Sequence, residues 1–331
     1  MKLKLTSLSI LLFVVISCSD SAKQNSSESS LALKESPKAN ADSLFNFVKE
    51  QVAFGPRVPN TEAHIKTADW LKYKFESYGA NVQFQEWEDF VFDGTKVNLK
   101  NIIASINPSA KKRIMLSAHW DTRPFSDQDS EDQYAPFDGA NDGASGVAVL
   151  LEVARLMSMN SPEVGVDFIL FDGEDWGEHV EESGTELREG LNSWYCLGSQ
   201  YWSKNKHKRN YSAYYGILLD MVGAKDAQFL YDSVSKQYAA RILDKVWSNA
   251  HALGYEDTFI KADGFAGITD DHVFVNQIAN IPMIDIIDFR TNGATSGFTP
   301  VWHTQDDNLE NIEKATLEKV ANVLLSVLYN E

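Results

Sequence analysis

The segment RIMLSAHWD, residues 113–121, is an apolar strand pattern that runs directly into a histidine and an aspartate. The arrangement recurs in VDFILFDGED, residues 166–175, where a second apolar run is followed by Glu174 and Asp175. A helical pattern over residues 145–157 separates the two runs. A strand, a helix and a strand in succession predict two parallel strands of one sheet, joined by a helix that covers one of its faces.

Strand and helix patterns alternate along the rest of the chain as well. Strands are predicted at 82–91, 98–106, 215–219 and 282–288, and helices at 44–52, 61–75, 197–202, 233–253 and 312–329. Asn60 is the expected N-cap of one helix, and Gly254 the expected end of another. With no internal repeat, the pattern predicts an α/β fold: a single three-layer domain whose mixed, mostly parallel central sheet is flanked by helices.

Acids and histidines follow these strands, at the edge of the sheet where the carboxyl ends of parallel strands meet and ligands bind. The set consists of His119, Asp121, Asp142, Glu174, Asp175, Asp220, Asp270, Asp271, His272 and His303. Oxygen and imidazole ligands together with a spare carboxylate are the composition of a catalytic zinc site. Adjacent Glu174 and Asp175 point in different directions in an extended segment, so one can bind a metal while the other carries a proton.

Each of these residues also has an ordinary structural explanation. Asp270 is suited to cap a short helix before His272, since Asp is a preferred N-cap residue. His303 alone is more typical of a buried structural histidine than of a ligand, and Trp302 and Phe298 are typical core aromatics. The expected convergence of the whole set at one sheet edge favours the site.

The N-terminus has the pattern of an export signal. Basic residues in MKLK, 1–4, precede an apolar run over 8–16 that is too short to span a bilayer. The run ends in VISC, residues 15–18, which resembles the lipobox of bacterial lipoproteins. We therefore expect a signal peptide over 1–17 and lipid attachment at Cys18, with an ordinary secretion signal and a chance cysteine as the alternative.

Lipid attachment would place the chain at the bacterial cell envelope, on the periplasmic side, with the membrane contacted only through the anchor at Cys18. Residues 18–39 are rich in Ser, Lys and Ala without an apolar period, and are the expected flexible tether to a folded domain over 40–331. Only Cys196 would remain in the mature domain, which excludes an intramolecular disulfide there.

The formal net charge of −17 argues against nucleic acid and against an anionic membrane surface as partners. Part of this charge lies in residues 176–194, a long acidic segment directly after Asp175. We expect this segment to be a solvated surface, with a rim or lid over the site as the weaker hypothesis.

Six stretches of the chain occur in an order that resembles the zinc-dependent glutaminyl cyclases of the M28 peptidase family. They are HWD (119–121), GAND (139–142), DGED (172–175), LDMVG (219–223), DDH (270–272) and WHTQDD (302–307). Each stretch alone is a weak signal, whereas the ordered set is a strong one. The resemblance extends from FGPR, residues 54–57, to the closing helix.

The resemblance implies a role for particular residues of this chain. Zinc would be bound by Asp142, Asp175 and His303. Glu174 would be the general base and acid, with Asp220 and Asp270 in its hydrogen-bonded network. Trp302 would line the substrate pocket, with Phe298 and Ile268 as neighbouring wall residues. One zinc is usual in the cyclases, with His119 and Asp220 engaged in hydrogen bonds.

Within the family, the resemblance favours a cyclase that converts the N-terminal glutamine of peptides and proteins to pyroglutamate. Aminopeptidases of the family typically have Ser-Asp-His where this chain has DDH (270–272), and they need no tryptophan at the position of Trp302. Asp175 departs from the glutamate of many animal cyclases. All five ligand positions of the two-zinc peptidases are filled, so a second zinc stays open. The alternatives are a two-zinc aminopeptidase and a non-catalytic peptide-binding lipoprotein of the envelope.

Overall fold

A computed structural model describes residues 33–264, 267–290 and 297–331 of the chain. The expected signal peptide 1–17, Cys18 and most of the expected tether lie outside the described residues. No helix in the described ranges is both long and apolar enough to cross a membrane. These ranges belong to one compact unit.

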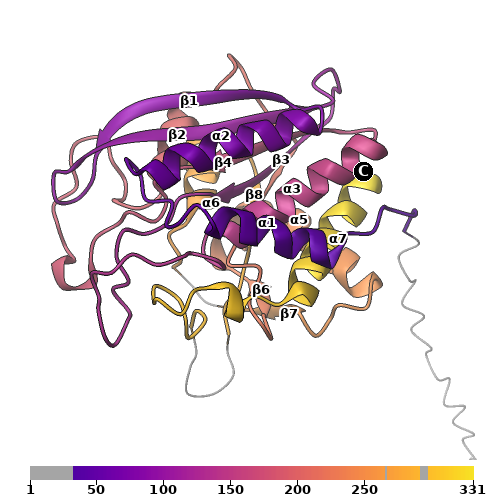
Figure 1. The fold of residues 1–331 in the computed structure, drawn as a ribbon. Helices are drawn as coiled ribbons and strands as arrows, with labels where there is room; N and C mark the ends of the chain where they lie inside the picture. The colour runs from indigo at the N-terminus through magenta and orange to yellow at the C-terminus, as the bar shows by residue number, and fades with distance from the viewer. Residues whose placement is uncertain (1–32, 265–266, 291–296) are drawn as a thin grey trace, which may run out of the picture. The chain divides into compact units, whose positions relative to one another are not determined.

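A six-stranded sheet runs through the centre of this unit in the order β1-β2-β4-β3-β5-β8 (Figure 1). Its strands are β1 (Asn81–Phe90), β2 (Lys96–Ile106), β3 (Arg113–His119), β4 (Gly165–Phe171), β5 (Gly216–Asp220) and β8 (Met283–Ile287). β1 pairs antiparallel with β2, and β2 with β4. β4, β3, β5 and β8 are parallel to one another. The predicted mixed, mostly parallel sheet is confirmed.

Helices cover both faces of the sheet. They are α1 (Ala41–Val52), α2 (Glu62–Ser77), α3 (Ala144–Met159), α4 (Leu197–Lys204), α5 (Ser233–Ala252), α6 (Asp271–Phe274) and α7 (Lys314–Tyr329). α1, α3 and α7 contact one another on the face that α2 and α5 also cover (Figure 1). α4 and a π-helical turn at Val275–Ala279 pack on the opposite face.

The two faces divide the strand residues between them, as alternating side chains must. On β3, Leu116 packs into the large cluster with α3 and α7, while Met115 packs into the smaller cluster with Trp202 of α4. The sheet is therefore buried on both sides, which explains why its parallel strands appear in the sequence as continuous apolar runs.

Two details at the helix ends test the sequence-based expectations. The prediction of Asn60 as N-cap is wrong: Thr61 is the cap, and its hydroxyl accepts a hydrogen bond from the His64 N–H at 3.2 Å. Asn60 has φ +74°, outside the extended region an N-cap needs, and its amide instead bonds to the backbone of Lys96. Gly254 has φ +81° after α5, as its expected role at that helix end requires.

Several short elements were not predicted. β6 (Phe229–Tyr231) and β7 (Phe259–Asp263), which precede and follow α5 in the sequence, pair with each other in a separate two-stranded parallel sheet. 3₁₀ turns occur at Val180–Glu182 and Leu309–Asn311. Such elements are too short to give a hydrophobic period in sequence.

The sheet order brings the carboxyl ends of several strands to one crevice. β3 and β5 are neighbours: the connection that leaves β3 runs to β4 on one side, and the chain that leaves β5 returns to the sheet at β8 on the other side. In open α/β sheets, ligands bind where the strand order reverses in this way. β3 ends at His119 and β5 ends at Asp220, and Glu174 follows β4 closely.

Candidate metal centre and active site

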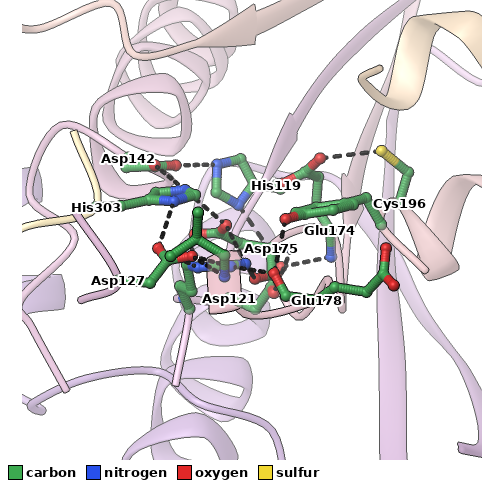
Figure 2. A network of polar contacts seen from close by, with 12 residues as sticks. His119, Asp121, Asp127, Asp142, Glu174, Asp175, Glu178, Cys196 and His303 are labelled. Atoms are coloured by element: carbon green, nitrogen blue, oxygen red, sulfur yellow. Dashed lines mark hydrogen bonds and ion pairs between the residues drawn. The ribbon is translucent and has the colours of Figure 1, made fainter. Parts of the chain in front are cut away.

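Three side chains from distant parts of the chain meet at this crevice. Asp142 precedes α3, Asp175 follows β4, and His303 comes from the loop before α7. The ligand atoms of the three residues all lie within 4.8 Å of one another. His303 Nε2 is 3.1 Å from Asp175 Oδ1 and 3.7 Å from Asp142 Oδ2 (Figure 2). The structure thus brings together the three residues that the resemblance implies as zinc ligands.

The chemistry of this group fits a bound cation. Asp142, Asp175 and His303 are each less than 5% exposed, with values of 4%, 2% and 4%. Two carboxylates buried this close together need a positive charge between them, because desolvation and mutual repulsion both penalise the pair. Two carboxylate oxygens and one imidazole nitrogen also match the three protein ligands of a catalytic zinc site.

A second group shares Asp142 with the first. His119 Nε2 is 2.9 Å from Asp142 Oδ1 and 3.2 Å from Asp220 Oδ1. Burial opposes the charging of His119, but its contacts with Asp121, Asp142 and Asp220 raise the pKa of the imidazole well above its ordinary value. His119 Nε2 thus lies between the carboxylates of Asp142 and Asp220. The same three side chains also form a possible second metal position.

Gly143 allows Asp142 to approach His119. Its φ is +94°, and a Cβ there would meet the Asp121 carbonyl oxygen at 2.7 Å and His119 Cε1 at 3.1 Å. Glycine is the residue that tolerates both this backbone conformation and this close approach. The glycine after Asp142 is thus a requirement of the site rather than an ordinary turn residue.

Arg123 and Asp127 support the first group, and sequence reasoning did not single them out. Asp127 Oδ1 is 3.2 Å from His303 Nδ1. Arg123 donates to both Asp127 oxygens, at 3.0 and 2.8 Å, and its backbone N–H donates to Asp175 Oδ2 at 3.1 Å. Burial would raise the pKa of Asp127, but His303 and Arg123 outweigh it and hold the pKa well below its usual range. An ionised Asp127 orients the imidazole so that Nε2 faces the ligand group.

Two further acids fix the loops that carry the ligands. Asp121 accepts the backbone N–H groups of Glu174 and Asp175, at 3.2 and 3.3 Å. Asp307 accepts the backbone N–H groups of Asn141 and Asp142, at 2.7 and 3.0 Å. Both acids lie in motifs that carry the resemblance, but no sequence pattern indicates that Asp307 binds the backbone of the Asp142 loop.

Glu174 is half-buried beside the ligand group and is not among its three members. Burial raises the pKa of its carboxyl well above the ordinary value, and the charges of Asp270, Asp175 and Asp271 add to this effect, while His119 opposes it. A carboxyl group with a raised pKa next to a metal position is suited to general acid and base catalysis near neutral pH. One oxygen of Glu174 lies 2.9 Å from the sulfur of Cys196 (Figure 2).

Asp270 combines a structural position with a place in the cavity. It is the N-cap of α6, where its carboxylate accepts the Asp271 N–H at 2.5 Å. It also lines the cavity beside Glu174. Burial and the charge of Asp220 raise its pKa to about 6. Behind it, His272 Nε2 lies 3.2 Å from Asp232 Oδ1, in a buried polar group that was not predicted.

One cavity of about 70 Å³ is lined by every residue that the resemblance implies as a zinc ligand, a catalytic group or a pocket wall. These are Asp142, Glu174, Asp175, Asp220, Ile268, Asp270, Phe298, Trp302 and His303. Trp302 stacks on His303 with 3.8 Å between ring centroids, and Phe298 lies 4.7 Å from Trp302. Tyr195 and Met221 also line the cavity and were not predicted. The cavity thus has a wall of acids and ligands and a wall of apolar side chains.

A family model described as peptidase family M28 matches residues 101–328, more than half of the chain. The chain belongs to this family. The predicted family resemblance and the α/β fold that it implies are confirmed.

Relatives with known structures carry two kinds of name. Bacteroides thetaiotaomicron glutaminyl cyclase bound to N-acetylhistamine is 47% identical with a TM-score of 0.85, covering 90% of this chain and 100% of that one. A Zn-dependent exopeptidase from Parabacteroides distasonis ATCC 8503 has the same identity, TM-score and coverage. Glutaminyl-peptide cyclotransferase of Bos taurus is 26% identical over 262 residues, 69% of this chain, and the match spans 64% of that protein, less than two thirds of its length.

Proposed function

We propose that this M28 family member is a glutaminyl-peptide cyclotransferase, which converts the N-terminal glutamine of a peptide to pyroglutamate and releases ammonia. One observation carries the proposal. Glu174 and Asp270, two carboxyl groups with raised pKa values, face the same small cavity as the ligand group and Trp302. The cyclase names of relatives at 47% and 26% identity support it.

Asp142, Asp175 and His303 would hold the zinc ion, and the donor set fits one. When bound, zinc supplies Lewis-acid polarisation of the γ-carboxamide oxygen of the substrate. Asp127 and Arg123 would keep His303 and Asp175 oriented for this task.

Glu174 would move the proton of the reaction. It accepts a proton from the α-amino group as the amine nitrogen forms a bond to the δ-carbon of the same glutamine residue. It then returns that proton to the carboxamide nitrogen, the bond between this nitrogen and the δ-carbon breaks, and ammonia leaves. Asp270 would accept a hydrogen bond from the carboxamide nitrogen and hold it beside Glu174.

Trp302, with Phe298 and Ile268, would fold the glutamine side chain back toward its own amine. The nucleophile and the electrophile belong to one residue, so holding them in a near-attack geometry removes much of the entropic cost. An apolar wall in a cavity of about 70 Å³ also limits the water that would compete as a nucleophile.

A second candidate function is a two-zinc aminopeptidase. The observation that favours it is the group of His119, Asp142 and Asp220, which shares Asp142 with the first ligand group. The exopeptidase name of one 47% identical relative points in the same direction. In that case water, rather than the substrate amine, would be the nucleophile.

Mass spectrometry of two peptides distinguishes these functions. The full-length protein is incubated with a Gln-initiated and a Leu-initiated peptide, each with and without a zinc chelator. We expect the Gln-initiated peptide alone to lose the mass of ammonia, and only without the chelator. Release of free N-terminal amino acids would replace the proposal with the aminopeptidase, and two unchanged peptides would leave a peptide-binding lipoprotein.

We also propose that the chain is anchored in the cell envelope through Cys18, for which the sequence VISC (15–18) is the support. Expressed in a Gram-negative host, the chain should fractionate with membranes, and Cys18→Ser should release it without loss of cyclase activity. A wild-type chain found only in the soluble periplasmic fraction would contradict the anchor.

A further inference from the structure

Cys196 contacts both the backbone and the side chain of Glu174. It directly precedes α4, and its backbone N–H donates to the Glu174 carbonyl oxygen at 2.8 Å. The Cys196 sulfur lies 2.9 Å from Glu174 Oε1 (Figure 2). The backbone contact fixes where the Glu174 residue lies, and the side-chain contact acts on the carboxyl group itself.

The thiol belongs to the polar side of the site rather than to the core. Cys196 has an exposed fraction of 0%, yet it is not a member of the three apolar clusters formed by the described residues. Its sulfur instead groups with carboxylate oxygens of Glu174 and Asp270, all within 4.8 Å of one another. Burial, with the nearby charge of Glu174, raises the pKa of the thiol well above its ordinary value, so the sulfur carries a proton that it can donate.

The backbone at this position gives no reason for a cysteine. Cys196 has φ +59° and ψ +37°, the left-handed conformation in which glycine or asparagine is favoured. A cysteine here is less favourable for the backbone than glycine would be. What the cysteine adds is the side chain that reaches Glu174.

We propose that Cys196 is a positioning residue for the general base: its S–H donates a hydrogen bond to Glu174 and holds that carboxyl group in the orientation that faces Asp270. The inference deepens the proposed function, since it depends on Glu174 as the base. Cys196 itself does not contact the substrate or react.

Three substitutions separate the hydrogen bond from the fold. They are made in the full-length chain with Cys18→Ser, so that Cys196 is the sole thiol. Cys196→Ser keeps a donor, Cys196→Ala removes it, and Cys196→Gly removes it while relieving the left-handed backbone. We expect Ser to retain kcat within about threefold, and Ala and Gly to lower kcat about tenfold with KM changed less than about twofold, since a hydrogen bond to a charged group is lost.

Infrared spectroscopy tests the hydrogen bond without activity. The S–H stretching band of the sole thiol lies at lower frequency when the thiol donates a hydrogen bond. In Glu174→Ala, which removes the acceptor, the band should shift to higher frequency. Glu189→Ala, an exposed acid in the neighbouring segment, is the matched control and should leave the band in place.

The outcomes are separable from those of the proposed function. If wild-type protein releases amino acids instead of ammonia, the proposed function fails, and the Cys196 variants are compared on that activity. If folded Cys196→Ala and Cys196→Gly, checked by thermal unfolding, retain wild-type kcat, the positioning role is overturned. A band that does not move in Glu174→Ala overturns it independently.

Discussion

The two halves of the metal centre around Asp142 are built differently. In the first half, His303 Nδ1 is 3.2 Å from Asp127, whose carboxylate Arg123 holds at both oxygens. In the second half, His119 Nδ1 is 3.6 Å from Asp121, which is too long for a hydrogen bond. Histidines that bind metal usually have their second nitrogen held by a hydrogen bond. The first half thus has a histidine oriented by a hydrogen bond to its second nitrogen, and the second half does not.

This difference shows how one arrangement of residues can serve one or two zinc ions. All five ligand positions are occupied by suitable side chains, so their identity alone does not determine the number of metals. The carboxylates around His119 raise its pKa, and its Nε2 lies between Asp142 and Asp220. We therefore expect the His119 imidazole, rather than a second cation, to lie between these two carboxylates, with one zinc per chain.

The largest effect is expected from removing a histidine in the first half. His303→Asn should lose nearly all bound zinc and all activity, while His119→Asn should keep about one zinc per chain and retain part of the activity. Asparagine suits His303 because its φ is +54°, a conformation that Asn tolerates. Zinc is measured by elemental analysis of the purified proteins. A wild-type chain with two zinc ions, one of them lost in His119→Asn, would contradict the difference between the halves.

Replacing the base should act on turnover without disturbing either half. Glu174→Gln is expected to lower kcat by about 100- to 10,000-fold, because a positioned acid or base contributes about this much. Zinc content should stay at the wild-type value, since Glu174 is not in either ligand group. Steady-state kinetics and zinc analysis check the two statements on one sample. Near-normal turnover would remove Glu174 from the proton-transfer step.

A smaller loss is expected from Asp270→Ser. Serine is also a good N-cap, so α6 should remain intact while the carboxylate that faces Glu174 is lost. We expect kcat to fall by about tenfold to 100-fold, less than the loss of a group that itself transfers the proton. Circular dichroism before the assay checks the fold. Unchanged cyclase kinetics would show that the extra aspartate does not distinguish cyclases from peptidases.

The sequence predicted the residues that follow strands, and it did not predict the residues that hold them. His119, Asp175 and Asp220 were predictable because the carboxyl ends of parallel strands meet at one edge whatever the loops do. Asp127 lies in a loop without a hydrophobic period, and its hydrogen-bond partner His303 is 176 positions away in the sequence. Such a contact depends on the folded loop, and a single sequence contains no local signal for it.

The pocket aromatics, the acidic segment and Cys196 also differ in how far the sequence alone could predict them. Trp302 and Phe298 were found only through the family resemblance, because an aromatic residue in a loop is as typical of a core as of a pocket. The acidic segment after Asp175 was expected to be solvated, and its residues 180–190 are exposed. Cys196 appeared in the sequence only as an unpaired thiol, since its contact with Glu174 needs the loop before α4 to fold back.

The smallest effect is expected from Asp127→Asn, which also tests the difference between the two halves most directly. Asp127→Asn keeps the shape of the side chain but removes the charge that pairs with Arg123 and accepts from His303. Loss of such a partner typically lowers metal affinity by about 10- to 100-fold. Competition with a fluorescent chelator measures the zinc affinity, and Glu131→Gln, an exposed acid in the same loop, is the control. Equal zinc affinity in the Asp127→Asn variant and the control would mean that the Asp127 contact does not orient His303 as a ligand. The two halves would then differ only in the more strongly raised pKa of His119.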